Sequence, residues 1–388
     1  MGRQASPWPA ILTGPDQILG SAGSRCSARL RWSPVRMPTS QCEAGAVPNR
    51  RRSRSRARLP AVTGWLIIVP LSISAAARAA RLGESSSLLV LVTGLTPLLG
   101  PPALVALGIG LWQRRWPLAA VSAATAAAHL VSALSGLGAP VRAPSSAGAL
   151  PALRLFSANV YHANRDLGRI GQEIRATAPD LVALQELDPD GAAGLQRSGV
   201  LARFPYAVIE LRKSPSGIGL WSRLPIADSQ VHDIHGMVVI KATILVGSHR
   251  LQLYTVHTVA PLGDDRVRWQ AQLRWIEEEI RQERGPLVVA GDFNATRYHP
   301  SFQQLLSERL GDAHEQRGRG WATTWPRDRW PPLPPLMRLD HVLISPDIGV
   351  RSVREGLGQG SDHRPIIAEL ILRSGAAALG RLEEREPP

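Results

Sequence analysis

Cysteine and lysine are almost absent from this 388-residue chain. The only two cysteines, Cys26 and Cys42, lie near the N-terminus, which excludes a disulfide framework and a thiolate metal site from the rest of the chain. Lys213 and Lys241 are the only lysines among the 45 basic residues. The sequence also lacks the glycine-flanked serine of a nucleophile elbow and the loop of a P-loop nucleotide-binding protein, which excludes both kinds of site.

The net charge of +14 is concentrated at the N-terminus. Residues 1–60 contain 11 Arg against Asp16 and Glu43 (+9), and residues 61–150 contain 5 Arg against Glu84 (+4). The remainder has 29 basic and 28 acidic residues, for a net charge of +1. The basic total is therefore weak evidence for a nucleic-acid-binding surface on the part of the chain that could fold as an enzyme.

Three segments have the composition of tails or linkers. Residues 1–60 are rich in Arg, Ser and Pro without apolar periodicity, which predicts a disordered tail. Met37 is an alternative start of translation, in which case residues 1–36 would be an artefact of gene prediction. Residues 142–152 are typical of a linker, and residues 374–388 are expected to form a second disordered tail.

Residues 61–141 contain three long apolar segments, which are predicted to be transmembrane helices at about 61–77, 86–112 and 116–138. They lie within uncharged runs of 17, 29 and 26 residues. The alternative is a set of buried helices in a soluble protein, where uncharged runs of this length are uncommon. The sequence therefore favours a multi-pass protein of the cell membrane, with the lipid bilayer as a partner.

Arginines predict the orientation of these spans. Arg114 and Arg115 lie in the short loop between the last two segments, and short loops with arginine prefer the cytoplasm, as does the basic tail. Three spans satisfy both preferences and place the C-terminal domain outside the cytoplasm, although Arg78 and Arg81 then fall on the outer side. If residues 61–77 do not span, the domain would be cytoplasmic.

From residue 153 to residue 373 the sequence alternates between apolar strand patterns and amphipathic helix patterns. Runs such as LRLFSANVY, DLVALQEL and PLVVAGDFN are typical of strands, and residues 264–285 form an amphipathic helical pattern that ends at Gly285. Hairpin-like strand pairs occur together with helical crossovers. The predicted fold class is therefore α/β with a mixed sheet.

Polar residues end or interrupt these apolar strands. In VVAGDFN, Asp292 and Asn294 are two positions apart and could share one face of a strand, although Gly, Asp and Asn are also common in turns. A single residue of this kind is more often structural, but the set recurs on successive strands. Its members are Asn159, Glu186, His257, Asp292, Asn294, Asp340, Asp362 and His363.

The chemistry of this set favours metal-assisted attack of water on a phosphate ester. Carboxylates and carboxamides without cysteine suit a hard cation, Mg²⁺ or alternatively Mn²⁺. Histidines supply proton transfer near neutral pH. Asp340 could orient His363 and stabilise its cationic form.

The ordered motifs NV, QE, H, GDFN, LDH and SDHRP, between about residues 150 and 372, resemble the endonuclease/exonuclease/phosphatase superfamily, which has the deoxyribonuclease I-like fold. Apolar spans before this domain are similar to the membrane-anchored bacterial branch of that family. The resemblance implies a four-layer α/β sandwich of two mixed β-sheets flanked by helices, and a Mg²⁺-dependent phosphoesterase.

The resemblance also implies a role for each motif residue. Glu186 is expected to be the principal Mg²⁺ ligand, with Asn159 and Asp362 on the metal side. Family members with an acidic residue at the position of Tyr161 use that residue near the metal. The lack of an acidic residue here argues against a second metal ion.

The catalytic roles come from the same resemblance. Asp292 is expected to position or deprotonate the attacking water, and Asn294 to hold that water and a phosphate oxygen. His363, with Asp340 as its partner, is expected to contact the scissile phosphate, and His257 is a candidate general acid.

Substrate identity depends on loops, and residues 318–340 are the expected specificity segment. Trp321, Trp325 and Arg327 are candidate substrate-binding residues, and the alternative is that the tryptophans pack the edge of the core. The predicted substrate is a phosphodiester of a nucleic acid or nucleotide. The alternative is a phospholipid or phosphoinositide headgroup, and a non-enzymatic binding module is the third reading. Nothing in the sequence identifies a protein partner.

Overall fold

The computed structural model describes residues 59–137, 152–213, 215–327 and 334–373. All of them belong to one compact unit. The predicted tails and the predicted linker lie outside these described residues, apart from residues 59, 60 and 152.

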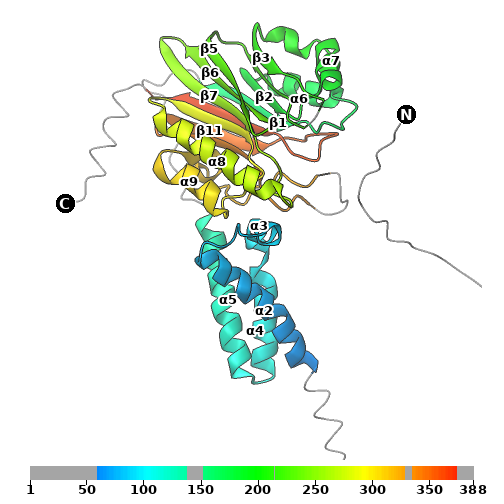
Figure 1. The fold of residues 1–388 in the computed structure, drawn as a ribbon, viewed down its shortest axis with the longest axis vertical. Coiled ribbons are helices and arrows are strands. Elements are labelled where there is room, and N and C mark those ends of the chain that lie inside the picture. Colours follow the sequence, from blue (N-terminus) through cyan, green and yellow to red (C-terminus); the bar gives the residue numbers. More distant parts are fainter. Residues whose placement is uncertain (1–58, 138–151, 214, 328–333, 374–388) are drawn as a thin grey trace, which may run out of the picture. The chain divides into compact units, whose positions relative to one another are not determined.

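The first β-sheet has six strands and is mixed (Figure 1). In the order β11-β12-β1-β2-β4-β3, the strands are Ile348–Glu355, Ile366–Leu372, Leu153–Asn159, Leu181–Gln185, Ile218–Ser222 and Tyr206–Glu210. Only β1 and β2 are parallel, and helix α6 (Gly168–Thr177) connects them. Helix α7 (Pro189–Arg197) and the short helix η2 (Val200–Arg203) follow β2.

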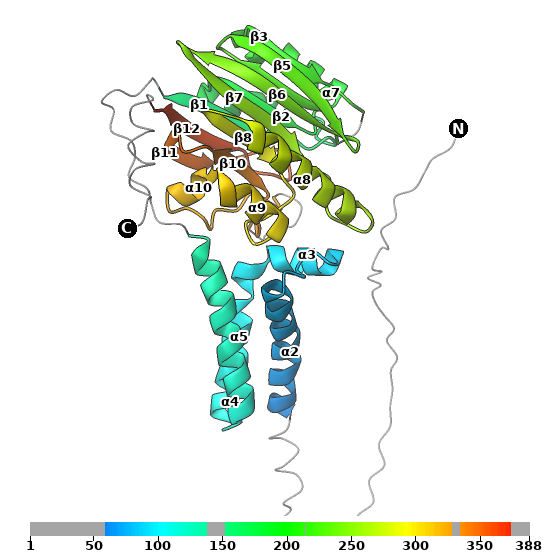
Figure 2. The same ribbon diagram turned by 60° about the vertical axis from the view of Figure 1, so that its left-hand side comes forward.

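The second sheet also has six strands (Figure 2). In the order β5-β6-β7-β8-β10-β9, they are Ile226–Ile234, Met237–Val246, His249–His257, Leu287–Asp292, Asp340–Ile344 and Gly311–Asp312. Only β7 and β8 are parallel, and α8 (Asp265–Gln282) connects them. Helices α9 (Pro300–Glu308) and α10 (Ala313–Gln316) lie between β8 and β10 in the chain.

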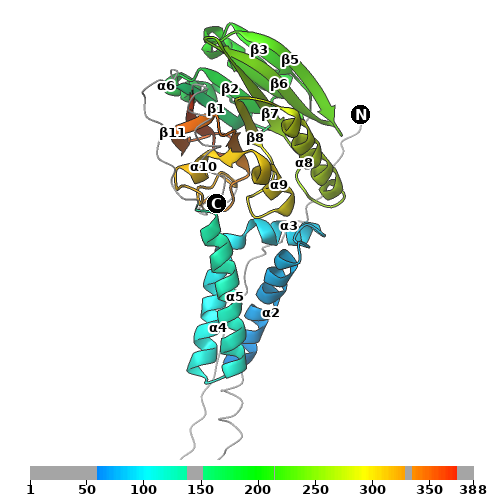
Figure 3. The same cartoon turned by 90° about the vertical axis from the view of Figure 1, so that its left-hand side faces the viewer.

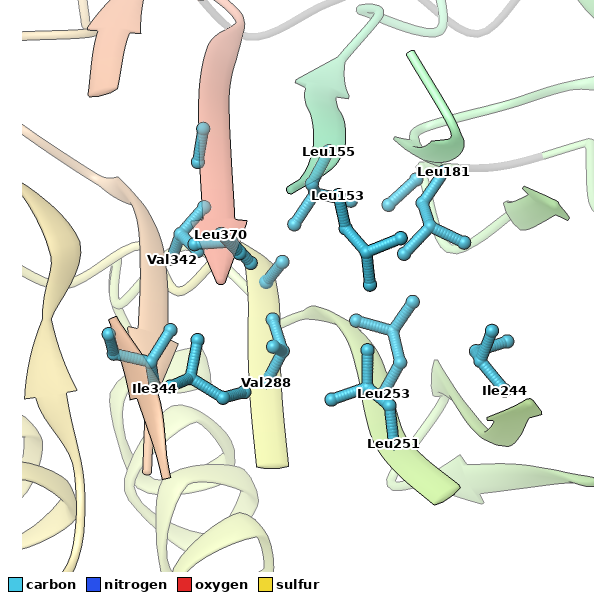
Figure 4. Close-up of a cluster of buried hydrophobic side chains, with 14 of the residues drawn as sticks. Leu153, Leu155, Leu181, Ile244, Leu251, Leu253, Val288, Val342, Ile344 and Leu370 are labelled. Carbon is cyan, nitrogen blue, oxygen red and sulfur yellow. The ribbon is translucent and has the colours of Figure 1, made fainter. Parts of the chain in front are cut away.

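The two sheets pack face to face around the main core (Figure 4). Strand alternation divides the side chains of β1, so that Leu153 and Leu155 enter this core while Phe156 and Ala158 pack under α6 and α7. On the second sheet, Val289 instead packs under α8 and α9. The predicted four-layer sandwich of two mixed sheets with helices outside is confirmed.

The N-terminal helices α2 (Leu59–Ala79), α4 (Gly100–Trp112) and α5 (Trp116–Ser135) pack against one another (Figure 3). Within the described residues, two helices are long and apolar enough to cross a membrane, at Ala61–Ala79 and Trp116–Ser135. They coincide with the first and third predicted spans.

The second predicted span, 86–112, is not one straight helix. It consists of α3 (Ser87–Gly94), a 3₁₀ turn η1 (Thr96–Leu98) and α4, with a bend of 65° between the two parts. The cause is local, since Pro97 lies in the turn and proline also occupies the start of α4. A proline ring removes a backbone donor and disfavours helical geometry in the preceding residue, so the helix breaks there.

Helix α3 packs on the α/β sandwich. Val90 is only 3% exposed and belongs to the same apolar cluster as Trp269 and Phe293. His299 accepts a hydrogen bond from Thr296 N at Nδ1, so its Nε2–H donates to Val90 O at 2.9 Å. Just before α3, Glu84 accepts from Ser301 N at 2.9 Å and from Ser301 Oγ. Helix α3 therefore contributes directly to the core of the α/β unit.

A Val90→Asp substitution is expected to lower the free energy of unfolding by about 3 kcal/mol or more, because it buries an unpaired carboxylate. The thermal midpoint of the full chain in detergent should fall by roughly 6–12 °C. Leu88→Asp on the same helix is the matched control, since Leu88 is 69% exposed, and it should change stability by about 0.5 kcal/mol at most. Equal midpoints for the two variants would contradict the packing of α3 on the domain.

Candidate active site

Strand alternation brings four of the predicted residues to one end of the space between the sheets. Asn159, His257, Asp292 and Asp340 each continue the inward-facing positions of β1, β7, β8 and β10. Asp292 is paired with His257 on one side and with Asp340 on the other. At this edge of the sheet, β7 and β8 end and β10 begins, which places a histidine and two carboxylates at adjacent positions.

Glu186 reaches the same place by a different route. It follows Gln185, the last residue of β2, and alternation alone would direct its side chain to the outer face with Val182 and Leu184. Its backbone instead has a φ of 55°, in the left-handed region, which redirects the chain. Its carboxylate consequently accepts hydrogen bonds from His162 Nδ1 at 2.6 Å and Asn159 Nδ2 at 2.9 Å.

The Asn159 amide lies between two carboxylates. Its Nδ2 donates to Glu186 Oε1 at 2.9 Å and to Asp292 Oδ2 at 3.0 Å, and its Oδ1 accepts from Tyr161 N at 2.9 Å. In this arrangement the amide group orients both carboxylates. Burial would raise the pKa of Glu186, but the hydrogen bond from His162, the charge of His257 and the hydrogen bond from Asn159 lower that pKa to about 2. Glu186 is therefore anionic at neutral pH.

His363 and Asp340 form a buried pair. His363 Nδ1 donates to Asp340 Oδ2 at 2.8 Å, and His363 Nε2 lies 3.7 Å from Asp292 Oδ2. Burial would lower the pKa of His363, but the charges of Asp340 and Asp292 raise it to about 10. The imidazole is therefore held protonated, with its Nε2–H directed to the side of Asp292.

The other histidine has a fixed tautomer. His257 Nδ1 lies 3.0 Å from Pro215 O, a carbonyl that can only accept, so Nδ1 carries the proton. Its Nε2 lies 3.8 Å from Glu186 Oε1 and 3.7 Å from Asp292 Oδ2. Asn294 stands on the other side of Asp292, with its backbone N–H donating to Asp292 Oδ1 at 2.8 Å and its Nδ2 donating to Thr258 O at 2.8 Å.

These side chains line a pocket of about 590 Å³. Glu186, His257, Asp292, Asn294, Asp362 and His363 all contribute to its surface, together with Tyr161 and His162. Many of the other lining residues are apolar, and α3 contributes Ser87, Val90 and Leu91. The structure thus brings the predicted catalytic residues into one pocket, with Asp340 and Asn159 directly behind it.

The predicted substrate-binding residues are divided. Trp325 lines the pocket, and its Nε1 donates to Asp362 Oδ2 at 3.4 Å. Trp321 is half exposed and donates from Nε1 to Ala133 O of helix α5 at 2.9 Å, outside the pocket lining. Arg327 is likewise outside that lining and donates from its backbone N–H to Asp362 O at 2.8 Å.

Two residues with a direct place in the site were not predicted from the sequence. His162 donates to Glu186 from both its backbone and its ring. Ser361 donates from Oγ to Asn159 O at 2.7 Å and accepts from His363 N at 3.0 Å, so it joins the end of β1 to the loop that carries His363, between β11 and β12 of the same sheet. Ser361 stands next to Asp362 in the SDHRP motif, and this position was the sequence signal that could have identified Ser361 as a site residue.

One group of three side chains and, separately, the Glu186 carboxylate could hold a cation. Ligand atoms of Asp292, Asp340 and His363 lie within 4.8 Å of one another. A protonated imidazole cannot bind a metal, however, so this group fits proton handling better. Glu186 is anionic, its side chain is 14% exposed, and it lines the pocket, so it is the better anchor for a hard divalent ion.

Two facing mixed sheets with carboxylates and histidines at one end define a phosphoester hydrolase of the two-sheet sandwich type. Residues 156–363 match the family model described as Endonuclease/Exonuclease/phosphatase family. The chain belongs to this family, whose members are metal-dependent hydrolases of phosphoester bonds, and the resemblance found in the sequence is confirmed.

Solved structures are similar to this chain at low sequence identity. An endonuclease/exonuclease/phosphatase from Beutenbergia cavernae has 22% identity, with 58% of this chain and 72% of the other covered and a TM-score of 0.48. TDP2 from D. rerio, complexed with a single strand DNA product, has 18% identity, covering 56% and 98%, with a TM-score of 0.50. A search of curated proteins found no match to this chain.

Proposed function

We propose that this protein is a Mg²⁺-dependent phosphoesterase whose catalytic domain is anchored to the cell membrane by its N-terminal helices. The observation that carries the proposal is the position of Asp292 Oδ2, with the Asn159 amide at 3.0 Å and His257 Nε2 and His363 Nε2 each at 3.7 Å. A carboxylate surrounded in this way can orient a water molecule and accept its proton, while two imidazoles face the reacting phosphate.

Each side chain has a distinct proposed task. Asp292, with Asn294 beside it, positions and deprotonates the attacking water. His363 stabilises charge that develops on the phosphoryl oxygens, and Asp340 keeps His363 protonated and oriented. His257 is the candidate general acid for the leaving group. His257 Nε2 lies 3.7 Å from Asp292 Oδ2, so the proton that Asp292 accepts from the attacking water would pass to His257 and from there to the leaving group.

Glu186 and Asp362 would hold the Mg²⁺ ion, for which Mn²⁺ is a possible substitute, and Asn159 would orient the Glu186 carboxylate. The ion would supply charge neutralisation at the phosphate. The donor set supports this assignment because its oxygens suit a hard cation, and because Glu186 is kept anionic in a largely buried position.

Chelation is expected to abolish phosphoester hydrolysis by the purified full chain, and Mg²⁺ or Mn²⁺ should restore it, because the carboxylate oxygens suit a hard cation and that ion would neutralise charge at the phosphate. The measurement is release of phosphate or nitrophenol from a soluble phosphodiester, before and after treatment with a chelator. A chain treated with chelator and then supplied with Ca²⁺ serves as a control for metal identity. Activity that persists in the chelator would refute the mechanism.

Exposed apolar side chains support the membrane anchor. Leu66 on α2, Leu104 on α4 and Val131 on α5 are 71%, 55% and 68% exposed. Water-exposed apolar surface along three packed helices is costly, whereas a bilayer would cover it. Arginines lie near both ends of α4. The Arg78 side chain donates to Thr96 Oγ1 at 2.8 Å, shortly before α4 begins, and Arg114 and Arg115 follow its C-terminal end.

The catalytic domain is expected to lie outside the cytoplasm, because the basic N-terminal tail and the Arg114–Arg115 turn both favour the inner side. Protease added to intact spheroplasts should digest the chain after residue 150 and spare a cytosolic marker. Complete protection of the domain until lysis would instead place it in the cytoplasm.

Two classes of substrate are proposed. The sequence favours a nucleic acid or nucleotide, and the DNA product bound by TDP2 supports that class. The lipid alternative is supported by a separate observation, the apolar lining that α3 adds to the catalytic pocket.

A further inference from the structure

The catalytic pocket has a polar floor and an apolar wall. We define the apolar wall as Leu91, Met237, Pro261, Leu262, Met337 and Leu339, which all line the pocket. Within the described residues, no arginine or lysine lines this pocket. The wall is therefore suited to contact a hydrocarbon chain rather than the phosphates that flank a scissile bond in a nucleic acid.

Part of this wall belongs to the membrane-associated helices. Leu91 lies on α3, which stands in the chain between two apolar helices, α2 and α4. The Ser87 hydroxyl of α3 donates to Gly263 O at 3.4 Å, so α3 lies beside the loop that carries Leu262. Leu91 and Leu262 are 45% and 63% exposed, which leaves them available to a ligand.

The position of α3 in the chain relates the pocket to the bilayer. Helix α3 is short and is bent by 65° from α4. Val90 on the helix and Glu84 just before it anchor α3 to the catalytic domain. If α2 and α5, the two helices long and apolar enough to span, cross the membrane, α3 follows α2 in the chain at the level where α2 leaves the bilayer. Apolar side chains on such a helix, adjoining a catalytic pocket, provide a path from the bilayer to the reacting groups.

We infer that the substrate is an amphiphilic phosphoester taken from the bilayer, with its phosphoryl group at Asp292 and His363 and its hydrocarbon chain against the apolar wall. This inference rests on the proposed phosphoesterase function and specifies its substrate class. Burial of one methylene group strengthens binding about fourfold, so contact with even a short chain should be measurable.

The test compares two synthetic phosphodiesters that differ only in chain length, methyl and hexyl 4-nitrophenyl phosphate. The full chain is used in phosphatidylcholine nanodiscs with Mg²⁺. We expect kcat/KM for the hexyl ester to exceed that for the methyl ester by at least about tenfold, which burial of two methylene groups would produce. Leu91→Gln should reduce this ratio at least about threefold.

The matched control is Leu357→Gln. Leu357 is 62% exposed and lies outside the pocket lining, so the ratio should equal that of the unmodified chain. Because partition of the hexyl ester into the nanodisc is the same for all three proteins, a difference between the variants reports contact at α3. Leu91→Gln with an unchanged ratio would overturn the inference.

A single-stranded oligonucleotide forms the third arm. If its kcat/KM exceeds that of the hexyl ester, the substrate class is nucleic acid, and the inference is wrong while the proposed phosphoesterase function stands. A hexyl-to-methyl ratio near one also overturns the inference alone. Failure to hydrolyse any of the three compounds in Mg²⁺ would overturn the proposed function and the inference together.

Discussion

Replacing Glu186 with glutamine is expected to abolish Mg²⁺-dependent turnover at ordinary metal concentrations without unfolding the protein. The glutamine keeps the size of the side chain but removes the anionic charge that the site maintains, with a carboxyl pKa of about 2. The Mg²⁺ concentration for half-maximal activity should rise by about 100-fold or more, beyond the 10–100-fold typical of losing an indirect partner of a ligand. Apo stability should change by about 1 kcal/mol at most, since the His162 partner is half exposed.

Glu355→Gln is the matched control for this experiment. Glu355 is also a largely buried acid, and burial, which would raise its pKa, is outweighed by His314, Arg319 and Arg364, so that the pKa falls to about 2. It accepts from His314 at 2.9 Å and from Arg319 at 2.9 Å, outside the catalytic pocket. This variant should lose about 1–3 kcal/mol of stability but keep its metal dependence. An unaltered Mg²⁺ requirement in Glu186→Gln would remove Glu186 from the metal site.

Replacing His363 with alanine is expected to reduce kcat at least about 100-fold while the protein still binds Mg²⁺. His363 is a protonated group beside Asp292, and it has a carboxylate partner of its own in Asp340, at 2.8 Å. Its loss leaves Asp340 buried without that donor, so stability should also fall by about 1–3 kcal/mol. Steady-state kinetics, together with a metal-induced shift of the thermal midpoint, separate the two effects.

His314→Ala is the matched control for His363→Ala, because His314 is a buried histidine with a purely structural role. His314 is fully buried and donates to Glu355 at 2.9 Å, away from the pocket. The His314→Ala variant should lose stability but retain turnover per folded molecule.

If His363→Ala kept near-full turnover, the proposed role of His363 would be wrong. Should it fail to fold, His363→Gln, which retains a side-chain donor, would distinguish a positional role from a chemical one.

The sequence predicted the chemistry of the site because strand alternation is a local property. In β1 and β8 a polar residue follows an inward-facing apolar series, and in β10 a polar residue precedes one, so Asn159, Asp292 and Asp340 had to enter the space between the sheets once these strands formed. The fold class followed from the same alternation, together with the helical pattern of residues 264–285.

Other features depended on contacts between distant segments. Alternation would send Glu186 outward, and a φ of 55° together with His162 and Asn159 brings it into the site. The exposed Trp321, a candidate for substrate binding, instead contacts the carbonyl of Ala133 on α5. Neither outcome is visible in a local pattern.

Helix α3 shows the difference between what the sequence determined and what only the tertiary structure decided. Composition alone determined that residues 86–112 are apolar, and composition cannot distinguish a helix covered by lipid from one covered by protein, since both environments favour the same side chains. Only the tertiary structure decided that Val90 enters the core of the catalytic domain and Leu91 lines its pocket. The physical reason is that this burial requires a complementary surface, which residues more than 140 positions away provide, as the contact between Val90 and His299 shows.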